Sequence, residues 1–159
     1  MPKATSRKLS NATSLKQLAE QCSAFAVALN EDVTALAKDI EKELVFKLVN
    51  LTPVDTSKAL SNWQVSFSTP NRGVRAAYAL GRKGTTASSS RAVAYAVAVS
   101  TINQQKPTDT IVWVSNNVSY INLLNMGYSP QAAARFINNI VADVEVEADN
   151  RLRKLLNGY

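Results

Sequence analysis

Histidine is absent from this 159-residue chain, and cysteine occurs once, as Cys22. Histidine is the side chain whose charge changes nearest to neutral pH, so its absence excludes a serine or cysteine nucleophile that relies on a histidine base. Its absence also removes the commonest metal ligand, while a single cysteine can form neither an internal disulfide nor a cysteine-based metal cluster. We therefore expect no metal site, no cofactor and no enzymatic activity.

Long apolar runs are missing as well. No stretch of 18 apolar residues occurs, so the sequence predicts no membrane-spanning helix and no membrane partner. Residues 1–13 are rich in serine, threonine and lysine and lead into no apolar segment of the kind that a secretory signal needs, so we interpret them as a flexible arm. Residues 14–157 have the length of a single domain.

Acidic residues are missing from the middle of the chain. None occurs between Asp55 and Asp109, and residues 56–142 carry eight basic side chains against Asp109 alone, a local charge of +7 (8 − 1) in a chain whose net charge is +6. Such a surface attracts a polyanion or an acidic protein, although charged side chains that simply face solvent would give the same pattern. The residues that we expect to face DNA are Arg72, Arg75, Arg82, Lys83 and Arg91.

Two apolar stripes predict two long helices. Between Leu15 and Leu48, apolar residues recur roughly every 3.6 positions, so residues 14–50 are expected to form one continuous helix about 55 Å long. Cys22 lies on this stripe and is expected to be buried. A break at residues 30–32, where Asn-Glu-Asp could start a second helix, is the alternative. A second stripe predicts a C-terminal helix with Ser129 as its N-cap and Pro130 at its first position.

Two short segments between these helices are typical of strands. Residues 63–69 alternate, with Trp63, Val65 and Phe67 on one face, and residues 110–116 are apolar on both faces, which predicts a strand covered on both sides. Because two strands cannot fold alone, we expect an α+β fold in which a long N-terminal and a long C-terminal helix pack against a small antiparallel sheet.

Residues 70–109 are expected to form a variable, basic insertion. Residues 81–90 are rich in glycine, serine and threonine and predict a mobile basic loop, but the glycine spacing and the Gly-Lys-Ser/Thr ending of a phosphate-binding loop are missing. Residues 90–103 predict a helix that is small and apolar nearly all round. This helix is expected to be buried or to lie against a neighbouring subunit.

The two segments that join helices to strands contain residues that typically end or begin helices. After the first long helix, Pro53 ends the helix and Asp55 occupies the position of an N-cap for a short helix over residues 56–62. After the second strand, residues 119–126 predict another short helix, and Gly127 is placed to stop it in the left-handed conformation.

These two segments resemble motifs of the tail-completion and head–tail joining proteins of long-tailed bacteriophages. PVDTSKALSNW at residues 53–63 is similar to that family's P-V-D-T-G-x-L-x-x-S-W, and SNNVSYINLLNMGYSPQ at residues 115–131 is similar to its S-N-x-x-x-Y-x-x-x-L-x-x-G-x-S-x-Q. The order of helices, strands and motifs also matches. Ser57 stands where the motif has glycine, so a positive φ is less expected there. The residues that carry over, as structural positions, are Pro53, Asp55, Thr56, Trp63, Tyr120, Gly127 and Gln131.

The resemblance implies a non-catalytic virion protein, made in the host cytoplasm and assembled into the neck between head and tail. There it would form a ring of six or twelve subunits that completes the tail or joins it to the head. Its neighbours would be a portal or adaptor protein and a tail tube or tail terminator protein. The basic residues would face packaged DNA without sequence specificity, or an acidic protein rim, and residues 1–13 and 90–103 are candidate contacts between subunits.

A free nucleic-acid-binding protein is the alternative, because the local charge favours it. Tyr78 is the only aromatic residue between Arg72 and Arg91, however, and no nucleic-acid reading motif is apparent. An enzyme is the third and least favoured hypothesis, since Asp55 and Asp109 are the only carboxylates of the basic middle and nothing pairs them.

Overall fold

The computed structural model describes residues 15–158, and the arm predicted over residues 1–13 lies outside this range. The elements follow in the order α1 (Leu15–Leu51), η1 (Leu60–Asn62), β1 (Gln64–Phe67), α2 (Ala87–Asn103), β2 (Val112–Ser115), α3 (Ile121–Asn125) and α4 (Phe136–Leu156). β1 and β2 pair in an antiparallel two-stranded sheet, with Val65 opposite Val114. The expected α+β fold with a long helix at each end is confirmed.

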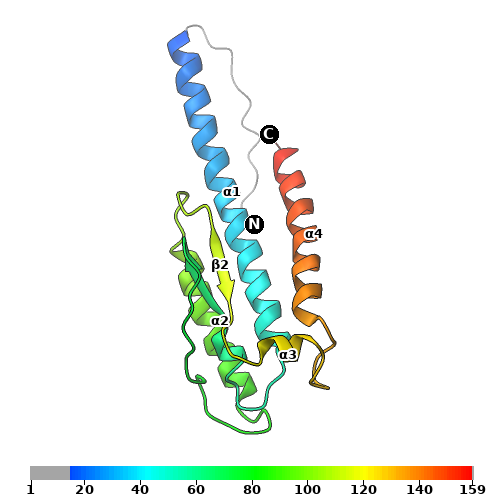
Figure 1. The fold of residues 1–159 in the computed structure, drawn as a ribbon. Helices are drawn as coiled ribbons and strands as arrows, with labels where there is room; N and C mark the ends of the chain where they lie inside the picture. The colour runs from blue at the N-terminus through cyan, green and yellow to red at the C-terminus, as the bar shows by residue number, and fades with distance from the viewer. Residues whose placement is uncertain (1–14, 159) are drawn as a thin grey trace.

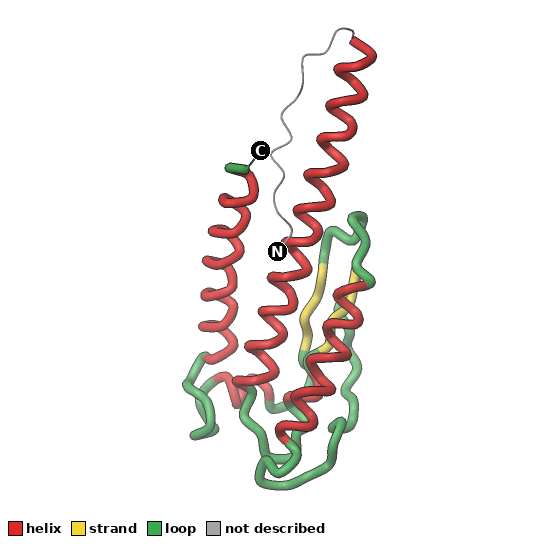
Figure 2. Tube along the Cα trace, turned by 180° about the vertical axis from the view of Figure 1, so that it is seen from behind, coloured by secondary structure: helices red, strands yellow, loops and turns green. Residues whose placement is uncertain are grey.

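α1 is the central element of the fold. Its 37 residues form one uninterrupted helix, so the predicted continuity through residues 30–32 is confirmed. α4 runs along one side of α1, while α2 and the sheet lie on the other side (Figure 1). The N-terminal part of α1 extends beyond the other elements (Figures 1 and 2). Cys22 lies in this projecting part and is exposed, so the expectation of a buried thiol is wrong.

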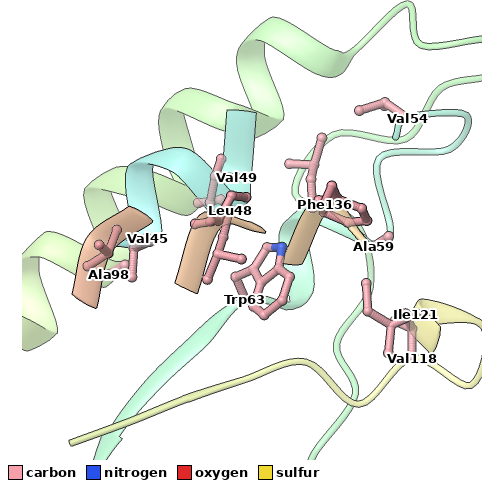
Figure 3. Packing of buried hydrophobic residues seen from close by; sticks show 14 of the residues in the cluster. Val45, Leu48, Val49, Val54, Ala59, Trp63, Ala98, Val118, Ile121 and Phe136 are labelled. Atoms are coloured by element: carbon pink, nitrogen blue, oxygen red, sulfur yellow. The ribbon is translucent and has the colours of Figure 1, made fainter. Parts of the chain in front are cut away.

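The hydrophobic core surrounds the C-terminal half of α1. Leu48 and Val49 are buried there beside Trp63 and Phe136, which come from the first motif and from α4 (Figure 3). The indole N–H of Trp63 donates to the hydroxyl of Thr52 at 2.8 Å, and that hydroxyl donates to the carbonyl of Leu48 at 2.6 Å. These two hydrogen bonds satisfy a buried donor and tie the end of α1 to the start of the sheet.

β1 is shorter than the predicted strand, and its most buried residue is polar. Gln64 is buried, and its amide donates to the carbonyl of Gly73 at 2.7 Å. The carbonyl oxygen of the same amide accepts from the guanidinium of Arg75 at 2.8 Å. The segment after the first strand therefore returns along the outer edge of β1, held by side chains instead of by a third strand.

β2 is covered on one face only. Val112 and Val114 are half-buried and line a hollow together with Val33 and Leu44 of α1, whereas Trp113 points to the opposite face and is 40% exposed. The prediction of a strand covered on both sides is therefore wrong. The physical reason is that α1 packs on one side of the sheet, and a run of apolar residues does not reveal how many layers cover it.

α2 confirms the helix predicted near residues 90–103, but it is buried on one side only. The residues that face the core recur every four positions and are Ser90, Ala94, Ala98 and Ile102. Val93 and Val97 on the outer face are exposed. Within residues 15–158, no helix has the length and apolar character that a bilayer crossing would require.

α4 begins at Phe136, six residues later than predicted. Ser129 makes only a local turn, in which its hydroxyl accepts from the N–H of Gln131 at 3.3 Å. The cap comes instead from Asn125 at the end of α3, whose side-chain oxygen accepts from the N–H of Ile137 at 2.9 Å. The carbonyl of Asn125 also accepts from the N–H of Arg135, which has a left-handed φ of 62°. The predicted Ser-Pro start is therefore wrong, because a residue eleven positions upstream of Phe136 caps α4.

Candidate functional site

The two motif segments meet in space. They enclose a hollow of about 300 Å³ at the end of the molecule where α1 ends, and we refer to it as the motif hollow. One wall comes from the residues after α1 and the other from α3 and the turn that follows it. The lining residues are Pro53, Val54, Asp55, Thr56, Ser57, Lys58, Ala59, Tyr120, Leu124, Ser129 and Gln131.

Gln131 joins the two motifs directly. Its side-chain oxygen accepts from the N–H of Val54 at 2.8 Å, and its side-chain N–H donates to the carbonyl of Val54 at 3.1 Å. One amide thus satisfies both backbone groups of a buried residue 77 positions away. The sequence indicated Gln131 as a structural position but gave no signal for Val54 as its partner.

Asp55 anchors the basic loop and does not cap a helix. The predicted short helix is reduced to the turn η1, whose N-cap position is Ala59 without any side-chain cap. The carboxylate of Asp55 accepts instead from the N–H of Lys83 at 2.8 Å, and its carbonyl accepts from the N–H of Gly84 at 2.9 Å. Both Lys83 and Gly84 have a positive φ, so the loop doubles back onto Asp55. The N-cap prediction is wrong because a partner 28 residues away uses the carboxylate.

Ser57 has a φ of 63°, although a positive φ was less expected at a residue other than glycine. Its side chain is buried, and its hydroxyl lies 3.0 Å from that of Thr86. Thr86 in turn donates to the carbonyl of Ala79 at 3.0 Å. The turn therefore needs the left-handed conformation whichever residue occupies it, and the hydroxyl chain ties this turn to the start of α2.

Tyr120 lines the second wall, and Gly127 lies in the turn that follows α3. Burial raises the pKa of the Tyr120 hydroxyl above its usual value, and the negative charge of Asp55 raises it further. The phenol therefore stays neutral at any physiological pH and can donate a hydrogen bond. Gly127 has a φ of 93°, so the predicted left-handed stop is confirmed. A Cβ at this position would lie 2.9 Å from the Cβ of Ala134.

The five predicted DNA-facing residues differ in how exposed they are. Arg75 is half-buried, stacks over the ring of Tyr78 at 5.6 Å and donates to its hydroxyl and to Gln64. Arg91 is half-buried at the start of α2, and its Nε has no hydrogen-bond partner. Arg72, Arg82 and Lys83 are exposed.

A second hollow of about 420 Å³ adjoins the motif hollow, since Thr56 and Lys58 line both. Its lining is mostly apolar and consists of Thr56, Lys58, Val74, Arg75, Ala76, Ala77 and Leu80. Leu80 is 83% exposed. Together with Arg82 and Lys83, which follow Leu80 in the chain, these residues form a surface that we call the basic end. The sequence pattern did not single out its apolar part.

The ion pairs of the described chain are confined to two of its helices. Within residues 15–158, the six ion pairs all join side chains of α1 and α4. None of the eight cations between residues 58 and 135 forms an ion pair with a described residue. The cations of the basic end therefore form no ion pair within the described chain, although the carboxylate of Asp55 lies beside this surface and accepts from the backbone N–H of Lys83 at 2.8 Å.

The described residues of the motif hollow and the basic end offer hydrogen bonding and charge. Within this range, no three side chains of histidine, cysteine, aspartate or glutamate lie close enough to hold a metal ion. No protein-family model, no curated protein and no solved structure matches this chain.

Proposed function

We propose that this chain is a structural virion protein that forms a homo-oligomeric ring in the neck of a tailed bacteriophage. There it completes the tail or joins the head to the tail. The observation that carries this proposal is the meeting of the two motif segments, which Gln131 joins to Val54 across 77 residues. Two motifs that were matched separately in the sequence thus form one packed unit in the fold.

The backbone at Ser57 supports the same resemblance. Its φ of 63° is a conformation that glycine adopts freely, and Ser57 stands where the family motif has glycine. The polar groups of the motif are used in backbone hydrogen bonds, at Asp55 and at Gln131. This use supports a structural role for them and a non-catalytic function for the chain.

A ring of six or twelve identical subunits needs two different surfaces on each subunit, so that each copy binds the next by rotation. Portal or adaptor proteins on one side, and tail tube or terminator proteins on the other, are the partners that we propose. The exposed cations would face packaged DNA in the lumen or an acidic neighbouring protein.

Virions of the phage or prophage that encodes the chain provide the test. A tagged copy should be found in purified particles and located at the neck by labelled electron microscopy. A variant with Arg72, Arg75, Arg82, Lys83 and Arg91 changed to Gln should assemble poorly or lose packaged DNA. A control that removes the same charge elsewhere changes Lys16, Lys38, Lys106, Arg135 and Lys154 to Gln. Particles that lack the protein altogether would refute the proposal, and infectious particles built with the first variant would refute the role of the cations.

Free nucleic-acid binding is a second candidate, and the unpaired cations of the basic end favour it. It predicts that the isolated protein binds duplex DNA with an affinity that falls steeply as salt rises. Absence of binding at low salt would exclude it.

A further inference from the structure

The acidic residues of this chain gather on two helices. Ten of the twelve lie on α1 and α4, and only Asp55 and Asp109 lie elsewhere. The first part of α4 is the most one-sided, because residues 136–150 hold four acids and no base. α1 and α4 together also carry seven basic side chains, and a run of four acids without an intervening base is confined to this first part of α4.

One patch of α4 combines this negative charge with an exposed apolar residue. Val146 is 64% exposed. Asp143 and Asp149 stand three positions before and after it, so they are its neighbours on the helix surface. Glu145 directly precedes Val146 and projects roughly 100° round the helix from it, on the side away from Asp143. Asp143 and Glu145 are exposed and form no ion pair with a described residue. We call these four residues the acidic face.

The basic end has the complementary composition. Leu80 is exposed beside an apolar hollow of about 420 Å³, and Lys58 lines the same hollow. Arg82 follows two residues later and is exposed. DNA would satisfy the cations of this surface but would leave Leu80 and the apolar lining without a partner, because phosphates offer no apolar contact. A protein surface that places an apolar side chain among carboxylates would satisfy both.

We propose that the basic end of one copy of this chain docks on the acidic face of a second copy. Leu80 and the apolar hollow then receive Val146, while Lys58 and Arg82 lie against Asp143 and Glu145. The two surfaces belong to different sides of the molecule: loops near the end of α1, and the flank of α4 that faces away from α1 (Figure 1). The contact is therefore head-to-tail, the type that closes into rings. This inference rests on the proposed function and names the surfaces that would build the ring.

Two charge-reversed variants test the contact. One reverses the basic end (Lys58→Glu/Arg82→Glu), and the other reverses the acidic face (Asp143→Lys/Glu145→Lys). Each should weaken self-association about tenfold or more, measured by analytical ultracentrifugation at about 50 mM salt and up to about 1 mM protein. Leu80→Ser and Val146→Ser should weaken it as well, and circular dichroism checks that every variant is folded.

Mixing the two reversed variants gives the sharpest result. In the mixture, the reversed basic end of one variant can bind the reversed acidic face of the other, and the two unchanged surfaces can also bind each other. Association should therefore return in the mixture and not in either variant alone. Charge changes outside both surfaces serve as controls, namely Lys16→Glu/Lys106→Glu and Glu31→Lys/Asp39→Lys. Mixing these two controls should produce no such recovery.

Three outcomes would overturn the proposal: a protein that stays monomeric at low salt, reversed variants that associate as the parent does, or a mixture that does not recover. The proposed function has a separate readout. A neck ring seen in virions together with a mixture that fails to recover would keep the function and reject these surfaces. If association recovers in the mixture but purified virions contain none of the protein, the proposed surfaces would be kept and the proposed function rejected.

Discussion

At the scale of single residues, Ser57 shows how a turn can impose its conformation on an unfavourable side chain. A residue other than glycine costs roughly 1–2 kcal/mol in the left-handed region, and the buried hydroxyl contact with Thr86 offsets part of this cost. Ser57→Ala keeps the strain and loses the contact, whereas Ser57→Gly loses both the contact and the strain. We therefore expect the Gly variant to be about 1 kcal/mol more stable than the Ala variant in urea unfolding.

The same pair of substitutions at Ser23 provides the control. Ser23 is exposed within the regular helix α1, where glycine is about 1 kcal/mol less favourable than alanine. The order of the two variants should therefore reverse between the two positions. An Ala variant as stable as the Gly variant at position 57 would show that the turn can leave its positive φ.

Thr52 carries a second prediction at this scale. It is buried, and its hydroxyl accepts the indole N–H of Trp63 while donating to the carbonyl of Leu48. Thr52→Val leaves the indole donor buried without a partner, so we expect a loss of about 1–3 kcal/mol in the free energy of unfolding.

Thr34→Val is the matched control for Thr52→Val. Thr34 makes the same hydroxyl-to-carbonyl bond within α1, to Asn30 at 2.7 Å, and it accepts no indole. Its replacement should change stability by less than about 0.5 kcal/mol. Equal losses for the two variants would contradict a role for the indole bond.

At the scale of elements, α1 meets the segment after α2 through Glu41 and Gln105. The amide of Gln105 donates to one oxygen of Glu41 at 3.1 Å, while the other oxygen of Glu41 and the amide oxygen of Gln105 are buried without partners. Burial raises the pKa of the Glu41 carboxyl above its usual value, and the hydrogen bond from Gln105 and the charges of Lys38 and Lys42 only partly oppose this.

Because the folded-state pKa of Glu41 is raised, the folded protein holds this proton more tightly than the unfolded chain does. The contribution of Glu41 to stability is therefore greatest below its ordinary pKa and is lost as pH rises through the folded-state value. Glu41→Gln should be more stable than the parent at pH 7, and the difference should shrink as pH falls below the ordinary pKa. Urea unfolding across this pH range measures it, with Glu31→Gln on an exposed part of α1 as the control. A difference independent of pH would contradict the assignment.

The elements differ in how far the sequence could predict them. α1 was predictable because its apolar residues keep one period from Leu15 to Leu48. The start of α4 was not predictable. Ser129 and Pro130 have the sequence pattern of a helix start but form only a local turn, and Asn125 caps the helix instead. Asp55 was misassigned for the same reason, since its partner at Lys83 is distant in the chain. Five of the seven motif residues line the motif hollow, whereas Trp63 and Gly127 do not, and the pairing of the two segments across the fold gave no signal in the sequence.

At the scale of the whole molecule, ten of the twelve acidic residues lie on α1 and α4, whereas most basic residues of the middle of the chain lie in loops between the helices. The sequence did not predict, however, that the N-terminal part of α1 stands apart from the other elements (Figure 2). An apolar stripe identifies the face of a helix that can be buried, but it does not say whether anything packs there. Leu15, at the start of the stripe, is 86% exposed.

This projecting part of α1 should open more easily than the part that packs in the hydrophobic core. Helical stability in proteins comes mainly from tertiary packing, and the buried residues of α1 are Ala28 and, near its end, Val45, Leu48 and Val49. Native-state hydrogen exchange should therefore be faster for amides of residues 15–27 than for those of residues 40–51, by on the order of tenfold or more. Residues 40–51 of the same helix are the internal control, and uniform protection along α1 would contradict the prediction. If a neck ring holds the projecting part against a neighbouring subunit, exchange at the amides of residues 15–27 should slow on assembly, while exchange at residues 40–51 should stay unchanged.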